Sequence, residues 1–156
     1  MRTLIVYATK YGATKKIAED LGRYFGNAEL LNIDDNPEPS IFDYDFVILG
    51  SFLTAGMIHK RIKNFAVSHA GELKTKHFGI YVSGLDSRGE AEYFNRNFAP
   101  DILSAVKAKA FLGGVFDPEK CGFFACKAIK ILTKLNNYTS TIDDEKIKKF
   151  AEQLKI

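Results

Sequence analysis

The chain has 156 residues, 46% of them hydrophobic, and carries 22 basic and 19 acidic side chains, for a net charge of +3. This length supports one domain with its own core, and two cysteines are too few for a disulfide framework or a zinc site. The mild, mixed charge is unlike that of a nucleic-acid-binding protein. No apolar run approaches the ~18 residues of a membrane span and no leader precedes Leu4, so we expect an intracellular, cytoplasmic chain.

The first predicted elements are a buried strand and an amphipathic helix, joined by a short polar turn. Leu4–Tyr7 is a continuous run of β-forming apolar residues, as in a strand buried on both faces. The turn 8–14 is small and hydroxyl-rich, with Gly12 for a tight bend. Apolar residues then recur at helical spacing, at Ile17, Ala18, Leu21, Tyr24 and Phe25.

Four more strands alternate with helices along the rest of the chain. The strands are expected at 28–33, 46–50, 77–83 and 110–116. The helices are expected at about 58–69, 89–107, 119–136 and 143–155. Pro100 either kinks or restarts the second of these helices, and Thr141-Ile-Asp-Asp is a plausible capping box before the last.

This alternation predicts an α/β fold, a single three-layer, doubly wound domain over residues 1–156. Its five-stranded parallel sheet is expected in the order 2-1-3-4-5. In such sheets a ligand lies beyond the carboxyl ends of the first and third strands, where the winding direction reverses. The turns after the first, third and fourth strands should therefore converge.

The turn after the first strand has the features of an anion site. Free backbone N–H groups and the helix dipole attract negative charge at the start of the first helix. Lys15 and Lys16 occupy the first helical turn, where the dipole disfavours cations unless a phosphate offsets the cost. The alternative is that both lysines are simply solvated. The sequence has neither Gly-Lys-Ser/Thr nor G-x-G-x-x-G here, which argues against a nucleoside triphosphate loop and the usual dinucleotide fold.

The residues of this turn resemble the flavodoxin signature, in which threonine and backbone groups hold the phosphate of FMN. The resemblance rests on Tyr7-x-Thr9-x-x-Gly12-x-Thr14-x-x-Ile17-Ala18. It implies phosphate binding by six consecutive residues: Thr9, Lys10, Tyr11, Gly12, Ala13 and Thr14. Response-regulator receivers share this fold, but Ala8-Thr9 and Gly50-Ser51 offer no carboxylate for magnesium where a receiver needs one.

Two further turns resemble the isoalloxazine-binding loops of the flavodoxins. They are the apolar, glycine-bounded stretch 50–57 and the stretch 83–89. The resemblance implies cofactor contacts from two sets of residues: Ser51, Phe52, Leu53, Thr54, Ala55 and Gly56 in the first stretch, and Ser83, Gly84, Leu85 and Asp86 in the second. Taken singly, each turn is equally compatible with an ordinary connection from a strand to a helix.

Over essentially its whole length the chain resembles the menaquinone-dependent protoporphyrinogen oxidase branch of the flavodoxins, through GSFLTAG at 50–56 and FLGGVFDPEKCGFFACKAIKIL at 111–132. That branch often has an aromatic residue or an arginine near Gly56, which this loop lacks. The resemblance implies an FMN-dependent oxidoreductase that passes electrons to a quinone without an essential side-chain acid or base. Two alternatives stay open. One is a noncatalytic electron-carrier flavodoxin, against which the lack of strong acidic charge argues, and the other is a degenerate member that binds partners without flavin.

The feature of that branch is an extra helical segment, here at about 119–136. Read as a helix, it has Lys127, Lys130 and Lys134 on one face. Apolar residues occupy much of the other face: Phe124, Ala128, Ile131, Leu132 and Leu135. Such a helix is typical of peripheral contact with an anionic membrane, here at its inner face through residues 120–135, which would bring the flavin edge to a quinone. The alternative is an ordinary helix that packs its apolar face on the sheet.

The remaining reactive side chains are expected to have structural roles. Cys121 and Cys126 lie five residues apart; a redox pair is one interpretation, and idle or buried thiols are the favoured one. His59, His69 and His77 belong to different elements and are interpreted as surface or packing residues. Asp34 and Asp35 are assigned to a solvated turn after the second strand.

Overall fold

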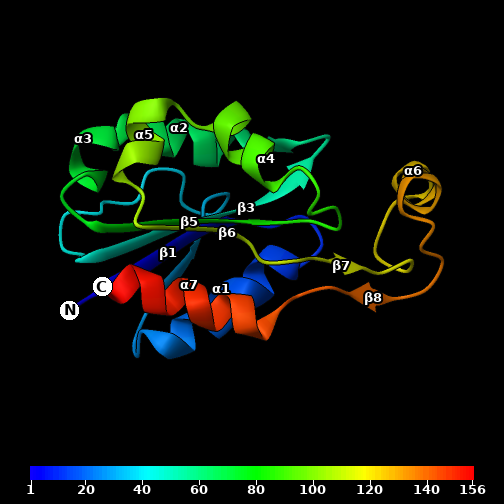
Figure 1. The fold of residues 1–156 in the computed structure, drawn as a ribbon, viewed down its shortest axis with the longest axis horizontal. Coiled ribbons are helices and arrows are strands. Elements are labelled where there is room, and N and C mark those ends of the chain that lie inside the picture. Colours follow the sequence, from blue (N-terminus) through cyan, green and yellow to red (C-terminus); the bar gives the residue numbers. More distant parts are fainter.

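The computed structural model describes residues 1–156, apart from the side chain of Leu132. Five parallel strands form the centre of the fold, in the order β2-β1-β3-β5-β6, which confirms the predicted topology (Figure 1). They are β1 (Thr3–Ala8), β2 (Glu29–Asn32), β3 (Phe46–Thr54), β5 (His77–Ser83) and β6 (Ala108–Phe111).

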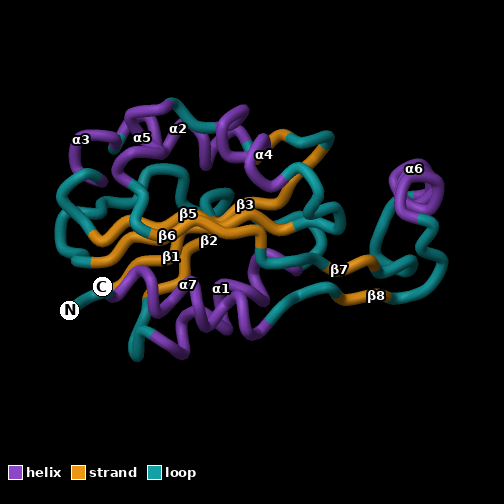
Figure 2. Tube along the Cα trace, in the orientation of Figure 1, coloured by secondary structure: helices purple, strands orange, loops and turns teal.

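Helices cover both faces of this sheet (Figure 2). One face carries α1 (Ala13–Tyr24) and α7 (Asp144–Lys155), and the other carries α2 (Lys60–Ser68), α3 (Ala70–Leu73), α4 (Glu90–Asn97) and α5 (Pro100–Ala105). Alternate residues of β1 enter the two cores: Leu4 and Val6 face one, while Ile5 and Tyr7 face the other. This two-sided burial is the reason that the strand is apolar at successive positions.

Two helix boundaries follow from local chemistry. The helical stretch 89–107 is broken at Phe98 and Ala99, and Pro100 restarts it as the first residue of α5. The N-cap of α7 is Asp143, whose Oδ1 accepts from the N–H of Lys146 at 3.0 Å. The expected capping box at Thr141 is therefore wrong, because the Thr141 hydroxyl accepts instead from the N–H of Gly114.

The third strand is longer than predicted and turns back on itself. β3 continues to Thr54 and pairs antiparallel with β4 (Met57–Ile58). The two residues between them, Ala55 and Gly56, have φ values of 51° and 76°. Two left-handed residues in a two-residue connection match the twist of a tight β-hairpin. The stretch assigned to a loop after Gly50 is thus a hairpin that projects from the sheet.

The region after β6 forms a projecting arm, which we define as residues 115–140. Gly113, with φ of 89°, interrupts the strand expected at 110–116. The chain then leaves along β7 (Val115–Phe116) and returns along β8 (Thr139–Ser140), which pair antiparallel. The arm carries α6 (Phe123–Thr133) at its tip, well separated from the rest of the molecule (Figures 1 and 2). The alternative in which this helix packs on the sheet is therefore wrong.

Tyr81 links the sheet to the start of α1. It lies beside Gly50 in the register of β5 and β3, and its hydroxyl donates to the carbonyl of Thr14 at 2.8 Å. A Cβ at Gly50 would lie 2.1 Å from the Tyr81 ring. Gly50 is therefore required by the path of this ring across the sheet. Burial raises the pKa of the Tyr81 hydroxyl well above 10, so it stays a neutral donor.

We expect Gly50→Ala to destabilise the protein by about 1–3 kcal/mol or more, because the added methyl displaces the anchored Tyr81 ring. Chemical denaturation of the two proteins measures the difference. Gly71→Ala is the matched control: a Cβ there meets no atom within 4 Å. It should leave the stability unchanged or raise it by up to ~1 kcal/mol. Equal stabilities for Gly50→Ala and the wild type would contradict the packing argument.

Candidate functional site

The three turns singled out by the sequence meet at the carboxyl edge of the sheet. Ala8 of β1 pairs with Ser51 of β3, and Phe52 pairs with Ser83 at the end of β5. The Thr14 and Ser83 hydroxyls lie 2.7 Å apart, in a buried hydrogen bond that joins the first turn to the third. The stretches 9–14, 51–56 and 83–86 therefore border one region of the surface.

The first turn is built to receive an anion. Gly12 is the N-cap of α1, with φ of 99°, and its N–H donates to the Thr9 hydroxyl at 3.0 Å. Among the described residues, no hydrogen bond uses the N–H groups of Ala13, Thr14 or Lys15. These donors sit at the positive end of the helix dipole, an arrangement that suits a phosphate group. The residues present thus fit the phosphate of FMN.

The two threonines of this turn have different surroundings. Thr9 is half-buried, whereas Thr14 is 1% exposed and already bonded to Ser83. One hydroxyl can donate one hydrogen bond and accept others, so Thr14 donates to a phosphate only when Ser83 acts as the donor between the pair. Ser83 therefore sets the direction of the Thr14 hydroxyl.

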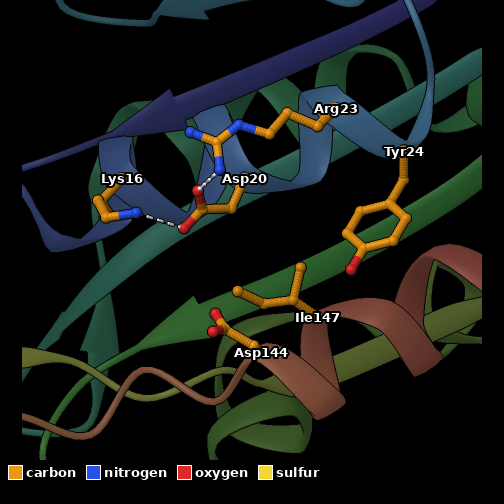
Figure 3. A pocket seen from close by; sticks show the side chains of 6 residues that line it. All are labelled: Lys16, Asp20, Arg23, Tyr24, Asp144 and Ile147. Atoms are coloured by element: carbon orange, nitrogen blue, oxygen red, sulfur yellow. Dashed lines mark hydrogen bonds and ion pairs between the residues drawn. The ribbon is translucent and has the colours of Figure 1, made fainter.

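Lys15 and Lys16 each lie one helical turn before an acidic residue. Lys16 Nζ is 2.7 Å from Asp20 Oδ2, and Lys15 Nζ is 4.0 Å from Glu19 Oε1. Arg23 also lies 3.0 Å from Asp20, so the carboxylate has a cation on each side (Figure 3). These i, i+4 pairs offset the unfavourable dipole term without a bound phosphate.

The ion pairs line a cavity of about 380 Å³ between α1 and α7. Tyr24, Asp144 and Ile147 complete its wall (Figure 3). None of the predicted cofactor residues is among those that line it. The cavity and the carboxyl-edge turns are therefore separate features of the surface.

The hairpin that follows β3 is held by Asn97 of α4. Asn97 is 1% exposed; its Nδ2 donates to the carbonyls of Gly56 and Tyr93, and its Oδ1 accepts from the N–H of Ile58. This role could not be predicted from the sequence, since asparagine in a helix normally lies at the surface. Asn97 fixes where the hairpin tip lies.

The predicted residues of the hairpin differ in exposure. Ser51 is buried, and its hydroxyl donates to the Phe52 carbonyl and accepts from the His59 N–H, each at 2.9 Å. Phe52 and Leu53 are half-buried, while Thr54 and Ala55 are exposed. Ser51 therefore orders the base of the hairpin, and the residues beyond it form the accessible surface.

An aromatic side chain and an arginine of α4 lie beside the tip of the hairpin. A Cβ at Gly56 would lie 2.7 Å from Arg96 Nη1 and 3.7 Å from the Tyr93 ring. The aromatic residue and arginine absent from the loop sequence thus come from a distant part of the chain. Their spacing in sequence, about forty residues from Gly56, is the reason that the motif did not reveal them.

The third turn is fixed by its own charges. Arg88 makes a two-point contact with Asp86, with Nε and Nη2 at 2.8 and 2.7 Å from the two carboxylate oxygens. These hydrogen bonds lower the pKa of Asp86 to about 2, so its carboxylate is ionised across the physiological range. The Tyr93 hydroxyl donates to the Asp86 carbonyl at 2.9 Å, which links this turn to the helix that holds the hairpin.

The remaining candidates lie outside this region. Cys121 and Cys126 form a disulfide, with Cα atoms 5.5 Å apart, so the expectation of idle thiols is wrong. Asp34 is 2.9 Å from Arg61 Nη1 and 3.7 Å from His59 Nε2, in an ion-paired turn. The described residues contain no cluster of three or more His, Cys, Asp or Glu arranged for a metal ion. They also contain no helix with the length and apolar character to cross a membrane.

Comparison with known proteins decides the family. The sequence pattern of the flavodoxin domain matches residues 4–143. The chain belongs to the flavodoxin domain family. Membership implies a flavin cofactor, for which FMN is typical.

Individual relatives agree with this assignment. The chain is 29% identical over 129 residues to protoporphyrinogen IX dehydrogenase [quinone] of Escherichia coli, covering 80% of this chain and 68% of that protein. It is 27% identical over 162 residues to an uncharacterised protein of Methanocaldococcus jannaschii, covering 99% and 98%. Oxidised flavodoxin 2 of Bacillus cereus superposes with a TM-score of 0.59 at 17% identity, covering 99% and 98%, which shows the shared fold.

We expect Asn97→Ala to destabilise the protein by about 2–4 kcal/mol, because it leaves buried groups of Gly56 and Ile58 without partners. Amide exchange at Ile58 should accelerate more than exchange in the central strands. Asn95→Ala, an exposed neighbour on α4, is the control and should change stability by less than ~0.5 kcal/mol. Unchanged exchange at Ile58 would show that Asn97 does not hold the hairpin.

Proposed function

We propose that the protein is an FMN-dependent oxidoreductase that oxidises a porphyrinogen-type donor and reduces a quinone. The observation that carries the proposal is the anion-ready turn beside the hairpin and third turn at one sheet edge. The 29% identity to a quinone-linked protoporphyrinogen dehydrogenase supports the choice of donor and acceptor. Each turnover moves two electrons and two protons from the donor to one quinone, which becomes a quinol.

In this proposal the three turns divide the work of binding. The free N–H groups of Ala13, Thr14 and Lys15 bind the phosphate, assisted by the hydroxyls of Thr9 and Thr14. The exposed part of the hairpin, at 54–56, and the third turn, at 84–86, flank the ring. The bound flavin supplies the two-electron chemistry. The turns are held in place by Asn97, Ser83 and the Asp86–Arg88 pair. The proposal assigns no side chain the role of acid or base.

The proposed quinone acceptor determines where in the cell the protein is expected to act. A quinone resides in a bilayer, so the proposal includes a cytoplasmic protein in peripheral contact with an anionic membrane through residues 120–135. The net charge of +3 is consistent with attraction to an anionic membrane. The protein also lacks the strong negative charge that steers the partners of a soluble electron carrier.

The first test is the dependence of binding on the phosphate. Thr14→Val should weaken FMN binding by about 10- to 150-fold, the equivalent of one hydrogen bond to a charged group. Riboflavin, which has no phosphate, should bind far more weakly than FMN and change little in the variant. Fluorescence titration of the apoprotein with each flavin measures both constants.

Ser83→Ala is the matched control for this test. It removes the other half of the Thr14–Ser83 hydrogen bond and frees the Thr14 hydroxyl, while that hydroxyl and the free N–H groups of the phosphate turn stay in the chain. It should weaken FMN binding much less than Thr14→Val while lowering stability by about 1–3 kcal/mol. Equal affinities for FMN and riboflavin in the wild type would remove the phosphate site.

The second test is turnover. The FMN-loaded protein should convert protoporphyrinogen IX to fluorescent protoporphyrin under anaerobic conditions only when a quinone is present. A flavin that is reduced by a reductase but oxidises no porphyrinogen would identify an electron carrier instead. A protein whose visible spectrum gains no flavin bands after incubation with FMN would identify a family member without cofactor.

A further inference from the structure

The arm carries most of the strongly exposed apolar surface. Among the described residues, six large apolar side chains away from the chain ends are at least 60% exposed. Four of these lie on the arm: Phe123 at 77%, Phe124 at 84%, Ile131 at 69% and Tyr138 at 63%. Side chains of this size, gathered at the tip of a projecting element, mark a surface for contact.

Cations share this surface with the apolar residues. Phe123, Lys127 and Ile131 follow one another at four-residue intervals on α6, and Lys127 and Lys130 are exposed with them. The half-buried residues Ala125, Cys126 and Ile129 form the other side of the helix. The exposed surface of α6 therefore carries the lysines together with Phe123, Phe124 and Ile131, and Leu132 lies outside the described side chains.

The charge of the arm identifies the kind of partner. The arm contains four of the 22 basic residues and two of the 19 acidic ones, Asp117 and Glu119, and Lys120 Nζ lies 3.8 Å from Asp117. The arm thus accounts for +2 of the net charge of +3, and residues 121–140 carry three lysines and no acidic residue. Long lysine side chains beside aromatic rings suit the boundary between anionic headgroups and acyl chains, because the ammonium groups stay in water while the rings enter the lipid.

The root of the arm ties it to the candidate site. The N–H of Gly84 donates to the carbonyl of Gly113, and that of Thr141 donates to the carbonyl of Gly114. A Cβ at Gly114 would lie 2.6 Å from the Gly84 carbonyl oxygen. The arm therefore leaves the body in direct contact with the third turn, at the carboxyl edge of the sheet. At its tip, the disulfide spans the pair Phe123 and Phe124 and restrains the first turn of α6.

We infer that the arm is a docking device for an anionic phospholipid surface. Phe123, Phe124 and Ile131 enter the headgroup boundary, Lys127, Lys130 and Lys134 contact phosphate groups, and the carboxyl edge of the sheet faces the lipid. This docking role rests on the proposed function, to which it adds the residues that contact the membrane and the orientation of the protein on it. The binding itself requires neither flavin nor substrate.

The test uses the full chain and vesicles without substrate. The protein should sediment with phosphatidylcholine vesicles that contain about one-third phosphatidylglycerol, at about 0.05 M salt, and stay in solution with pure phosphatidylcholine. Lys127→Glu, Lys130→Glu and Lys134→Glu together should lower the partition coefficient at least ~100-fold, since each lysine near such a surface contributes about fivefold. The control triple, Lys146→Glu, Lys148→Glu and Lys149→Glu on α7, has the same net charge and should retain most of the binding.

A tryptophan reporter tests which residues enter the lipid. The chain has no tryptophan, so Phe124→Trp introduces a single fluorophore at the proposed contact. Its emission should shift to the blue with anionic vesicles and be quenched by brominated acyl chains. Phe42→Trp, at an exposed phenylalanine of the body, should do neither.

Each outcome decides the inference. No sedimentation of the wild type with anionic vesicles at low salt overturns it, and would assign the exposed surface to a protein partner. Equal loss in both lysine triples overturns the specific role of the arm. If the protein binds vesicles but oxidises no porphyrinogen, the docking role stands and the proposed reaction is wrong. If it oxidises porphyrinogen with a water-soluble quinone but does not bind vesicles, the proposed reaction stands and the docking role is wrong.

Discussion

The contact of Tyr81 with Gly50 and Thr14 is the constraint on which the site depends. The ring crosses β3 where a glycine leaves room, and its hydroxyl holds a carbonyl of the first turn of α1. Two positions further along β5, Ser83 holds the hydroxyl of the same threonine. One strand thereby fixes the start of the helix whose free N–H groups belong to the candidate anion site. Because the hydroxyl of Tyr81 is buried and its pKa is raised, this anchor does not titrate in the physiological range.

A second set of close backbone contacts joins the arm to the body. Gly113 adopts φ of 89°, and a Cβ there would lie 2.0 Å from the Thr141 carbonyl oxygen. Together with the contact of Gly114 on Gly84, this packing leaves no side chain between the arm and the third turn. The arm therefore has a rigid root even though its tip is exposed. The root of the arm thus borders the candidate site, whereas α6 lies at the far end of the arm (Figure 1).

The sequence predicted the parts of the structure that depend on local pattern. The apolar run at Leu4–Tyr7, the helical spacing after it and the alternation of strands and helices determine the sheet order. It did not predict features that depend on distant partners. Thr141 reads as the start of a capping box, but Gly114 occupies its hydroxyl. Gly56 reads as a loop glycine, but Asn97, some forty residues later, determines where it lies. The spacing of Cys121 and Cys126 left their pairing open, and nothing in the sequence of α6 decided between a helix that packs on the sheet and one that projects from it.

Helix α4 connects the second and third turns of the candidate site. The hairpin sequence lacks the aromatic residue and arginine of the branch it resembles, yet Tyr93 and Arg96 lie beside Gly56. Tyr93 also donates to Asp86, and the carbonyl of Tyr93 accepts from Asn97. One helix thus connects the second and third turns through Tyr93 and two residues that follow it at three- and four-residue spacings, Arg96 and Asn97. A family motif written along the chain detects only residues that are close in sequence, whereas a planar ligand at this edge would meet whichever side chains are close in space. The surroundings of Gly56 are therefore set by residues that its own motif does not contain, and α4 is part of the candidate site.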